Sequence, residues 1–335
     1  MKTKIKHCWL LCLLAFCSCS SWIDIKPSDR LSEGMLFEDR QGFEKAINGV
    51  YVGLTDRALY GRTLSAGIID FMAQYYTYGS GSDMNSMVGA YRYEEDEIKA
   101  IFQSAWEKAY ALIVNCNIII EKCDAKREVL SDVYYGLYKG EAIALRAMLH
   151  LDMLRLFGPV YDDASKTEKS IPYVTNSDSE ISPLLSAEEI LNFVIEDLKV
   201  ALDLLKSVDP ILTEGVRNES NNDGGDNSLY YRQYRMNYYA VKALLARAYA
   251  WGHDGRNALI VAEEILREVQ VEGAEIFPFV EHSAAVDPSV TDRVFSTEVI
   301  FSLYDSYRGT EIQDKLFIPT VDQIYTFSSR RLGMG

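Results

Sequence analysis

Residues Gly140 to Val160, GEAIALRAMLHLDMLRLFGPV, decide the fold that we expect for this chain. They belong to a longer segment, Asp132–Phe157, that is apolar around most of a helical circumference. A helix of this kind must be covered by other elements on several sides, because little of its surface suits water. Gly158 and Pro159 follow it directly and form the expected signal for its end.

Small residues mark one face of this helix. Gly136, Gly140 and Ala144 recur every four residues, which clears a stripe of side chains and lets a neighbouring helix approach closely. The same helix contains His150, which has no second ligand at zinc spacing. We therefore interpret His150 as a hydrogen-bonded structural residue.

Further helices are predicted on both sides of this segment. Two amphipathic patterns precede it, and a capping box at Ser186–Glu189 opens a third pattern after it. Asn237–Trp251 and Arg256–Val269 are separated by a short turn, so we expect an antiparallel helical hairpin. The residues expected on buried faces are Phe43, Ile47, Val50, Tyr51 and Leu54 in the first, Phe102, Trp106, Ala109, Tyr110 and Ile113 in the second, and Ile190, Phe193, Val194, Leu198, Ala201 and Leu205 in the third.

Together these patterns predict a mainly α fold of tetratricopeptide-like helix pairs with long irregular loops. Helices rich in Ala, Tyr and Leu stack in such proteins because no single unit buries its apolar face alone. The usual period of about 34 residues is not present, so the expected repeats are degenerate. The irregular stretches run from Tyr75 to Asp96, Val160 to Pro183, Val208 to Ser228 and Phe277 to Arg293.

The amino terminus has the layout of a secretory leader. Lysines precede an apolar run, Cys8–Phe16, that is far too short to span a bilayer, for which about 20 residues are needed. Cys19 follows two small residues, whereas Cys17 follows the bulky Phe16. We therefore predict that residues 1–18 are a lipoprotein signal peptide and that Cys19 carries the lipid. A plain secreted protein with a cysteine-rich leader is the alternative.

Composition narrows the classes of function. The chain has a net charge of −15 and 48% hydrophobic residues, so a sizeable core is expected and phosphate contacts with nucleic acid are not. Beyond the leader and Cys19, only Cys116 and Cys123 remain. On one helix these two would lie about 10 Å from each other, which exceeds the reach of a disulfide. We expect both to be buried thiols.

No constellation of residues predicts an enzyme. The GSGSD run, Gly79–Asp83, lacks the glycine spacing of a dinucleotide loop and the serine spacing of a hydrolase elbow. The NESNNDGGDN loop, Asn218–Asn227, offers oxygen ligands like those of a calcium site, but Tyr230 stands where a bidentate glutamate is needed. We expect no cofactor, with a structural calcium ion in this loop as the open alternative.

Several segments together resemble one family. They are SSWIDIKPSDRLSE after Cys19, LFEDRQGFEKAINGVYVGL, WEKAYALIVNCN, the stretch quoted first, NYYAVKALLARAYAWGHD and STEVIFSLY. Their order and spacing look like the SusD/RagB family of outer-membrane nutrient-binding lipoproteins, over roughly Cys19 to Tyr304. The GEAIALRA segment, Gly140–Ala147, is the most specific of them.

This resemblance implies a SusD-like α superhelix at the cell outer membrane, lipid-anchored and exposed at the surface. Members of the family capture oligosaccharide or another nutrient and deliver it to a SusC-type TonB-dependent transporter, over which they sit as a lid. They bind and do not cleave. Members also carry a late helix that this chain lacks, since it stops at SSRRLGMG. Residues 19–335 therefore resemble a SusD-like domain that is incomplete at its C-terminal end.

A glycan site of this family type is expected in the first long loop. Sugar rings have an apolar face and a hydroxyl rim, so they favour aromatic rings beside carboxylates or amides. Tyr75, Tyr76 and Tyr78, with Asp83 and Asn85, give that combination. Adjacent tyrosines point in different directions in regular structure, so burial of at least one is the competing interpretation. A tetratricopeptide-type scaffold lipoprotein that binds a protein partner is the alternative function.

Overall fold

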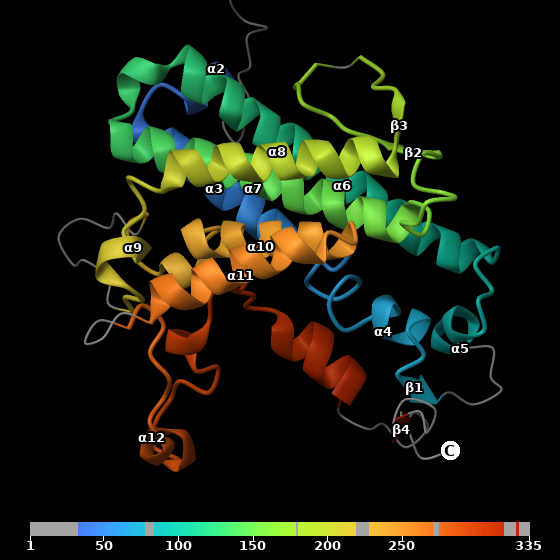
Figure 1. The fold of residues 1–335 in the computed structure, drawn as a ribbon. Coiled ribbons are helices and arrows are strands. Elements are labelled where there is room, and N and C mark those ends of the chain that lie inside the picture. Colours follow the sequence, from blue (N-terminus) through green and yellow to red (C-terminus); the bar gives the residue numbers. More distant parts are fainter. Residues whose placement is uncertain are drawn as a thin grey trace, which may run out of the picture.

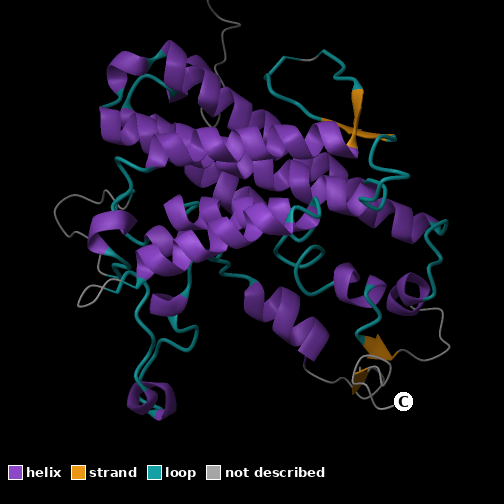
Figure 2. Ribbon diagram, in the orientation of Figure 1, coloured by secondary structure: helices purple, strands orange, loops and turns teal. Residues whose placement is uncertain are grey.

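The computed structural model describes residues 33–77, 84–178, 180–218, 228–270, 275–317 and 326–327. The predicted leader and Cys19 lie outside these residues. Within them helices dominate and strands are short (Figure 1; Figure 2). Among the described helices, none combines the length and the apolar character that a membrane crossing requires.

The helices and strands have the following bounds. The helices are α2 (Glu33–Leu36), α3 (Arg40–Leu54), α4 (Ile68–Met72), α5 (Met84–Gly89), α6 (Asp96–Ala125), α7 (Asp132–Phe157), α8 (Ala187–Leu205), α9 (Ile211–Glu214), α10 (Tyr238–Trp251), α11 (Gly255–Val269), α12 (His282–Val286) and a π-helical segment, Gly309–Phe317. The strands pair antiparallel in twos, and these pairs are β1 (Tyr76–Thr77) with β4 (Thr326–Phe327) and β2 (Lys169–Pro172) with β3 (Leu184–Ser186).

Helix α7 is central to the packing of the molecule, and its predicted bounds are confirmed. It packs against α6 and α8, and α10 packs on α8, so these helices form the layered body seen in Figure 1. Most of its side chains are buried, including those of Leu145 and Leu149. Ser131 caps its start by accepting a hydrogen bond from Tyr134 N, and Gly158 ends it.

The stripe of small residues on α7 receives α8, as predicted. A Cβ atom added to Gly140 would lie 2.9 Å from Leu205 Cγ. One added to Gly136 would lie 2.7 Å from Val208 Cγ2 and 2.9 Å from the carbonyl oxygen of Leu204. Both distances are shorter than a van der Waals contact, so only glycine permits this approach of the two helices.

The amphipathic patterns around α7 are confirmed with one exception. Phe43 and Ile47 of α3 are buried, and Ser186 and Glu189 form the expected capping box at the start of α8. Phe193 was expected in the buried stripe of α8 but is 41% exposed. Its ring stacks on Tyr173 at 5.2 Å between centroids, because this part of α8 faces the segment after β2 instead of another helix.

Four expected core aromatics are half-buried: Tyr51, Trp106 and Tyr110 pack against the main core, and Phe102 packs against a smaller cluster that includes Ile98. The hydroxyl of Tyr110 on α6 donates to the carbonyl oxygen of Pro172 at 3.0 Å. The hydroxyl of Tyr51 on α3 donates to Glu141 Oε2 at 2.7 Å. Trp106 packs edge-on against Phe157 at 5.1 Å between centroids. The two tyrosines thus contribute apolar area to the core while their hydroxyls find hydrogen-bond partners.

The stretches expected to be irregular contain short elements. Strand β1 and helix α5 lie between Tyr75 and Asp96, and β2 lies between Val160 and Pro183. Helices α9 and α12 lie in the two later stretches. Each of these elements is six residues or shorter, so none is long enough to show a helical or strand period in the sequence.

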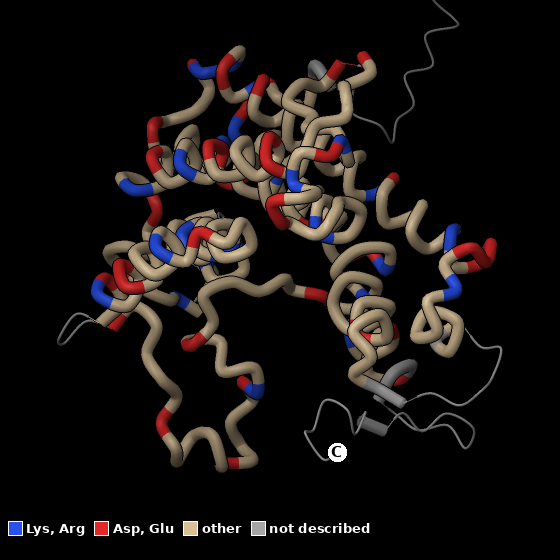
Figure 3. Tube along the Cα trace, turned by 45° about the vertical axis from the view of Figure 1, so that its right-hand side comes forward, with Lys and Arg blue, Asp and Glu red and all other residues tan. Residues whose placement is uncertain are grey.

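The hairpin of α10 and α11 is confirmed, with Asp254 capping α11 through a hydrogen bond from Asn257 N at 3.1 Å. The two cysteines of α6, Cys116 and Cys123, are free and buried, as expected. Burial raises the pKa of each thiol to about 12, which keeps both protonated. Acidic and basic residues are interspersed along the outer faces of the helices (Figure 3).

Candidate functional site

A network of buried charges lies between α7 and the segments that precede α10. Glu141 of α7 and Asp209, which follows α8, both pair with Arg232, and all three side chains are at most 3% exposed. Arg232 Nη1 donates to Glu141 Oε1 at 2.6 Å, and its Nε and Nη2 donate to Asp209 at 2.9 and 3.1 Å. Burial alone would lower the pKa of Arg232, but the two carboxylates raise it, so this guanidinium stays charged.

The carboxylate of Asp209 also fixes two segments of backbone. Its Oδ1 accepts a hydrogen bond from Ile211 N at 3.1 Å, and its Oδ2 accepts one from Tyr238 N at 2.9 Å. Ile211 begins α9 and Tyr238 begins α10. Amides at a helix start have no acceptor within the helix, so a buried carboxylate is a strong partner for them. One side chain thus sets the position of α9 relative to α10.

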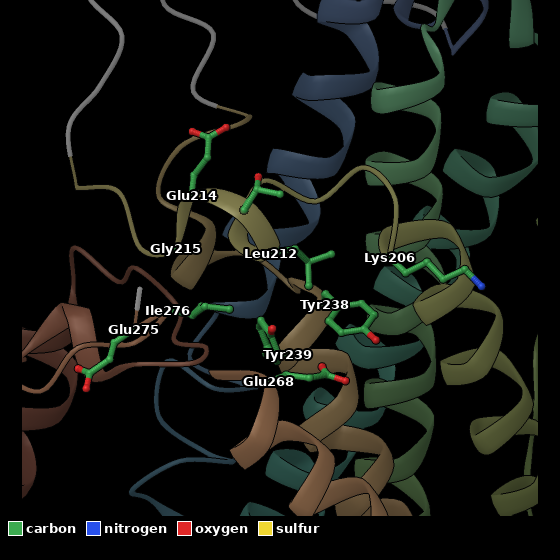
Figure 4. A pocket seen from close by; sticks show the side chains of 10 residues that line it. Lys206, Leu212, Glu214, Gly215, Tyr238, Tyr239, Glu268, Glu275 and Ile276 are labelled. Atoms are coloured by element: carbon green, nitrogen blue, oxygen red, sulfur yellow. The ribbon is translucent and has the colours of Figure 1, made fainter. Parts of the chain in front are cut away.

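A pocket of about 580 Å³ lies between these two helix starts, the end of α11 and the segment after it (Figure 4). Figure 4 shows Leu212, Ile276, Tyr238 and Tyr239 gathered around the centre of this pocket. The carboxylate of Glu214 points away from it. Its volume falls within the range of small-molecule sites, which is about 300–1,000 Å³.

Tyr239 is the most informative residue of the pocket. Its side chain is 2% exposed, and it packs edge-on against Tyr238 and Phe277 with ring centroids 5.4 and 5.7 Å away. In the part of the chain that the structure describes, its hydroxyl has no hydrogen-bond partner. Burial and the nearby carboxylate of Glu268 raise its pKa to about 12, so the hydroxyl keeps its proton. A tyrosine whose ring is packed and whose hydroxyl has no protein partner has donor and acceptor capacity left for a ligand.

Glu268 is held at the pocket by a lysine. Lys242 Nζ lies 2.6 Å from Glu268 Oε1 and 3.1 Å from Glu264 Oε2, and it also lies 5.3 Å from the centre of the Tyr238 ring. Burial alone would lower the pKa of Lys242, but its hydrogen bonds to Glu268 and Glu264 raise it. The ion pair fixes the carboxylate of Glu268 beside the two tyrosines, where it can accept further hydrogen bonds.

The opposite wall requires a glycine. Gly215 follows α9 with a φ of 64°, and a Cβ atom there would lie 3.2 Å from the carbonyl oxygen of Ile276. Val216 N donates to that same oxygen at 3.2 Å. Left-handed backbone is free of steric cost for glycine alone, so this position allows α9 to approach the segment at Ile276.

The pocket therefore combines an apolar wall with a small number of polar groups. Leu212, Ile276 and the faces of two tyrosines supply the wall, and the Tyr239 hydroxyl and the Glu268 carboxylate supply hydrogen bonds. This combination suits a neutral ligand that has both apolar faces and hydroxyl groups.

The predicted site residues lie elsewhere. Tyr75 is 44% exposed and follows the end of α4, Tyr76 pairs with Phe327 in the β1–β4 ribbon, and Asn85 lies in α5. Figure 1 places α4, α5 and β1 close together, on the opposite side of the molecule from α9. Tyr78 and Asp83 fall outside the described residues. None of the described loop residues lines the pocket of Figure 4.

Sequence reasoning missed Tyr238 and Tyr239, although a signal was present. They are adjacent tyrosines in the first turn of a predicted helix, directly after the cap residue Asn237. In the structure Tyr239 is buried, Tyr238 is half-buried, and both line the pocket. The charged residues within the apolar α7 segment, Glu141 and Arg146, were a second signal that partners must be buried nearby.

Arg146 and His150 of α7 tie down the segment after β2. Arg146 pairs with both oxygens of Asp197 at 2.8 Å and donates to Asn117 Oδ1 at 2.8 Å. Val174 N donates to His150 Nε2 at 3.0 Å, so Nδ1 carries the proton and donates to the carbonyl oxygen of Arg146 at 2.9 Å. The structural interpretation of His150 is confirmed. Among the described residues, no group of three or more His, Cys, Asp and Glu could hold a metal ion.

Comparison with known proteins identifies the family. The family model described as "Starch-binding associating with outer membrane" matches residues 21–213, which include α3, α6, α7 and α8. A curated SusD-like protein of Formosa agariphila is 26% identical over 194 residues, which are 55% of this chain and 34% of that protein.

Solved structures share the fold. A SusD superfamily protein of Bacteroides thetaiotaomicron has a TM-score of 0.53 at 20% identity, over 68% of this chain and 46% of that one. A SusD-like carbohydrate binding protein of Bacteroides vulgatus has a TM-score of 0.54 at 20% identity, over 74% of this chain and 47% of that one. This chain thus spans about half the length of the solved relatives and about a third of the curated one. Since the family model covers more than half of the residues, the chain belongs to the SusD-like family, which is described as starch-binding and associated with the outer membrane.

Proposed function

We propose that this protein captures uncharged oligosaccharides at the cell surface and delivers them to a SusC-type TonB-dependent transporter. The observation that carries the proposal is the pocket of Figure 4, which Tyr239 lines and where its hydroxyl has no hydrogen-bond partner among the described residues. The family description of starch binding supports the same class of ligand.

The chemistry of the pocket favours a neutral sugar over a charged one. Glu268 at the pocket is already paired with Lys242, and Glu275 adds a second carboxylate. Lys206 is the one cation among the described residues that line it, so the pocket offers an anionic sugar no excess of positive charge. The apolar wall suits the C–H face of a pyranose, and the Tyr239 hydroxyl and Glu268 carboxylate suit its hydroxyl rim. Glu268 is already paired with Lys242, so its role in this proposal is to accept hydrogen bonds and not to transfer protons.

The loop around β1 is the second proposed contact with glycan. Tyr75 offers an exposed ring, and Tyr76, Tyr78, Asp83 and Asn85 follow it in the sequence. Because this loop and the pocket lie on opposite sides of the molecule, a long oligosaccharide or two separate chains would be needed to occupy both (Figure 1).

Titration calorimetry of linear neutral oligosaccharides tests the pocket, with Tyr239→Phe as the variant. Loss of one hydrogen bond of about 1 kcal/mol should weaken binding about fivefold. Folding stability should change by less than about 0.5 kcal/mol, because the hydroxyl has no protein partner to lose. Tyr110→Phe is the matched control: its hydroxyl bonds Pro172, so stability should fall while affinity is kept.

The proposal would be contradicted if a folded sample showed no measurable binding to any neutral glycan in a broad panel. That result would leave the scaffold function, in which the helix pairs bind a protein.

Mass spectrometry of the mature amino terminus tests the lipid anchor separately. A diacylated Cys19 is expected, and an unmodified amino terminus would contradict the anchor. Co-purification with the transporter tests the proposed delivery step.

A further inference from the structure

The segment that leads into α10, residues 232–238, is held at two points by one carboxylate of α7. Arg232 Nη1 donates to Glu141 Oε1 at 2.6 Å, at the start of the segment. Met236 N donates to the hydroxyl of Tyr51 at 2.7 Å, and this hydroxyl donates to Glu141 Oε2 at 2.7 Å. Each oxygen of Glu141 therefore serves one of the two points.

Tyr51 of α3 can make this link because a phenol donates and accepts at the same time. Burial and the neighbouring carboxylate of Glu141 raise the pKa of Tyr51 well above its usual range, so the hydroxyl keeps the proton that it donates. The guanidinium of Arg235 lies 4.7 Å from the centre of the Tyr51 ring, and its Nη2 donates to Asn48 Oδ1. These contacts fix the ring that carries the linking hydroxyl.

Asp209 and Asn237 hold the end of the same segment. The carboxylate of Asp209 bonds Arg232 and accepts a hydrogen bond from Tyr238 N at 2.9 Å. Asn237 Nδ2 donates to the carbonyl oxygen of Arg232 at 2.9 Å. Arg232 and Asn237 are at most 2% exposed, so water does not compete for these hydrogen bonds.

The first turn of α10 follows directly and supplies both tyrosines of the pocket in Figure 4. Glu141 does not line this pocket, but its two hydrogen bonds determine where that turn lies. A hydrogen bond between two oxygen atoms needs a distance of about 2.5–3.0 Å. A shift of about 0.5 Å in the start of α10 is therefore enough to misplace the hydroxyl of Tyr239.

We infer that Glu141 is a positioning residue for this pocket: it holds the first turn of α10 where the hydroxyl of Tyr239 can bond a sugar hydroxyl. Glu141 itself touches no ligand and acts through residues 232–238. The inference rests on the proposed function, because it takes the pocket to be a site for neutral oligosaccharide.

Titration calorimetry of linear neutral oligosaccharides tests the inference with Glu141→Gln, which keeps the shape of the side chain but replaces one acceptor oxygen with a donor group. Affinity should fall about fivefold, as for Tyr239→Phe, since the same hydrogen bond to the ligand is lost. The double variant Glu141→Gln/Tyr239→Phe should bind no more weakly than either single variant, because effects that act through one group do not add. A loss of about 25-fold in the double variant would mean that the two residues act independently, and it would overturn the inference.

Asp197→Asn is the matched control. Asp197 is the partner of Arg146, a second arginine at α7 whose side chain is only 8% exposed. This variant also removes one carboxylate from a buried ion pair, so folding stability should fall while affinity is kept. An equal loss of affinity in Asp197→Asn would show that loss of any buried ion pair weakens binding, contrary to a specific role for Glu141.

Tyr51→Phe is a milder second variant if Glu141→Gln folds poorly, because it removes only the link between Glu141 and Met236 N. Its affinity should also fall, and circular dichroism verifies that each variant is folded. Unchanged affinity in folded Tyr51→Phe and Glu141→Gln would overturn the inference.

Hydrogen exchange followed by NMR tests the positioning without any ligand. The amides of Met236 and Tyr238 donate to side chains of this network, so they should exchange at least about tenfold faster in Glu141→Gln and at an unchanged rate in Asp197→Asn. Unchanged exchange in Glu141→Gln would overturn the positioning role even if glycan binds. Absence of glycan binding by the unchanged protein would instead contradict the proposed function, so the two failures can be distinguished.

Discussion

Arg232 shows how much a single buried charge contributes to this fold. Its guanidinium bonds two carboxylates, Glu141 and Asp209, in an environment where all three groups are shielded from water. Replacing Arg232 with Met leaves two buried carboxylates without a cation, which should cost about 3–5 kcal/mol of folding free energy. Urea denaturation measures this cost.

Arg92→Met is the control for that experiment, because Arg92 pairs with Glu95 while both side chains are more than 40% exposed. Its effect should stay within about 1 kcal/mol. A similar small effect for Arg232→Met would show that the buried network can be dismantled without penalty, contrary to our expectation.

His150 predicts a pH dependence of stability. Burial lowers its pKa from the usual 6.5 to about 3, so the unfolded chain binds this proton more tightly than the folded one. Stability from this group is therefore present above pH 6.5 and is lost as pH falls toward 3. Between pH 7 and pH 5 the loss should be about 2 kcal/mol. Urea denaturation of the unchanged protein and of His150→Gln at both pH values isolates the contribution of His150. An equal loss of unfolding free energy in the two proteins would refute the assignment of this pH dependence to His150.

At the residue scale, the structural role of His150 could be predicted from the sequence, whereas the ion-pair partners of Glu141 and Arg146 could not. His150 could be assigned a structural role because no second metal ligand stood near it in the sequence. Glu141 and Arg146 pair with Arg232 and Asp197, which are far away along the chain. Which charge meets which depends on how the loops fold back, so these pairs could not be derived from local pattern.

At the scale of elements, replacing Gly136 of α7 or Gly49 of α3 with alanine tests how closely α8 packs on α7. Gly136→Ala should gain helix propensity of about 1 kcal/mol but place a methyl group 2.9 Å from the carbonyl oxygen of Leu204. Overpacking of this kind costs about 1–3 kcal/mol, and more when backbone must shift, so the net effect should be destabilising.

Gly49→Ala is the matched control, because nothing lies within 4 Å of the added methyl group. It should stabilise the protein by up to about 1 kcal/mol. Thermal denaturation of the two variants gives shifts of opposite sign if α8 packs on this stripe as described. Shifts of the same sign would mean that α8 can move away without cost.

Long elements were predictable and short ones were not. The bounds of α7 and the capping box of α8 follow from residues within each segment, so they could be predicted directly. Phe193 was misplaced because periodicity shows which residues share a face but not whether a neighbour covers that face. Strand β1 and helix α5 depend on tertiary contacts, and the sequence carries no period for them.

At the scale of the whole molecule, burial is unevenly distributed. Helix α7 is buried over most of its length, whereas in the described structure Ile265 is the one buried residue of α11, and Leu259 and Leu266 are more than half exposed. Amides of α11 should therefore exchange with solvent through local openings of lower free energy than those of α7. Hydrogen exchange monitored by mass spectrometry measures the difference, and equal protection of the two helices would contradict it.

The pocket of Figure 4 could not have been predicted from the sequence, because its lining residues come from separate segments of the chain. Its walls come from three segments of the chain, residues 206–215, 238–239 and 268–276, which only the packing of the helices brings together. The site predicted in the loop around β1 rests on aromatic residues that are neighbours in the sequence, Tyr75, Tyr76 and Tyr78. A site made of neighbouring residues can be found as a motif in the sequence. A cavity between helix ends is lined by residues that belong to no single motif, so the sequence does not show it.

The hydrogen bonds of Asp209 have a consequence for protein engineering. Because one carboxylate anchors the first turns of α9 and α10, both walls could be grafted together into a related scaffold. Such a transplant must carry residues 141, 209 and 232 as a single cassette, since a chimera that inherits only part of this charge triad would bury an orphan ion at the seam.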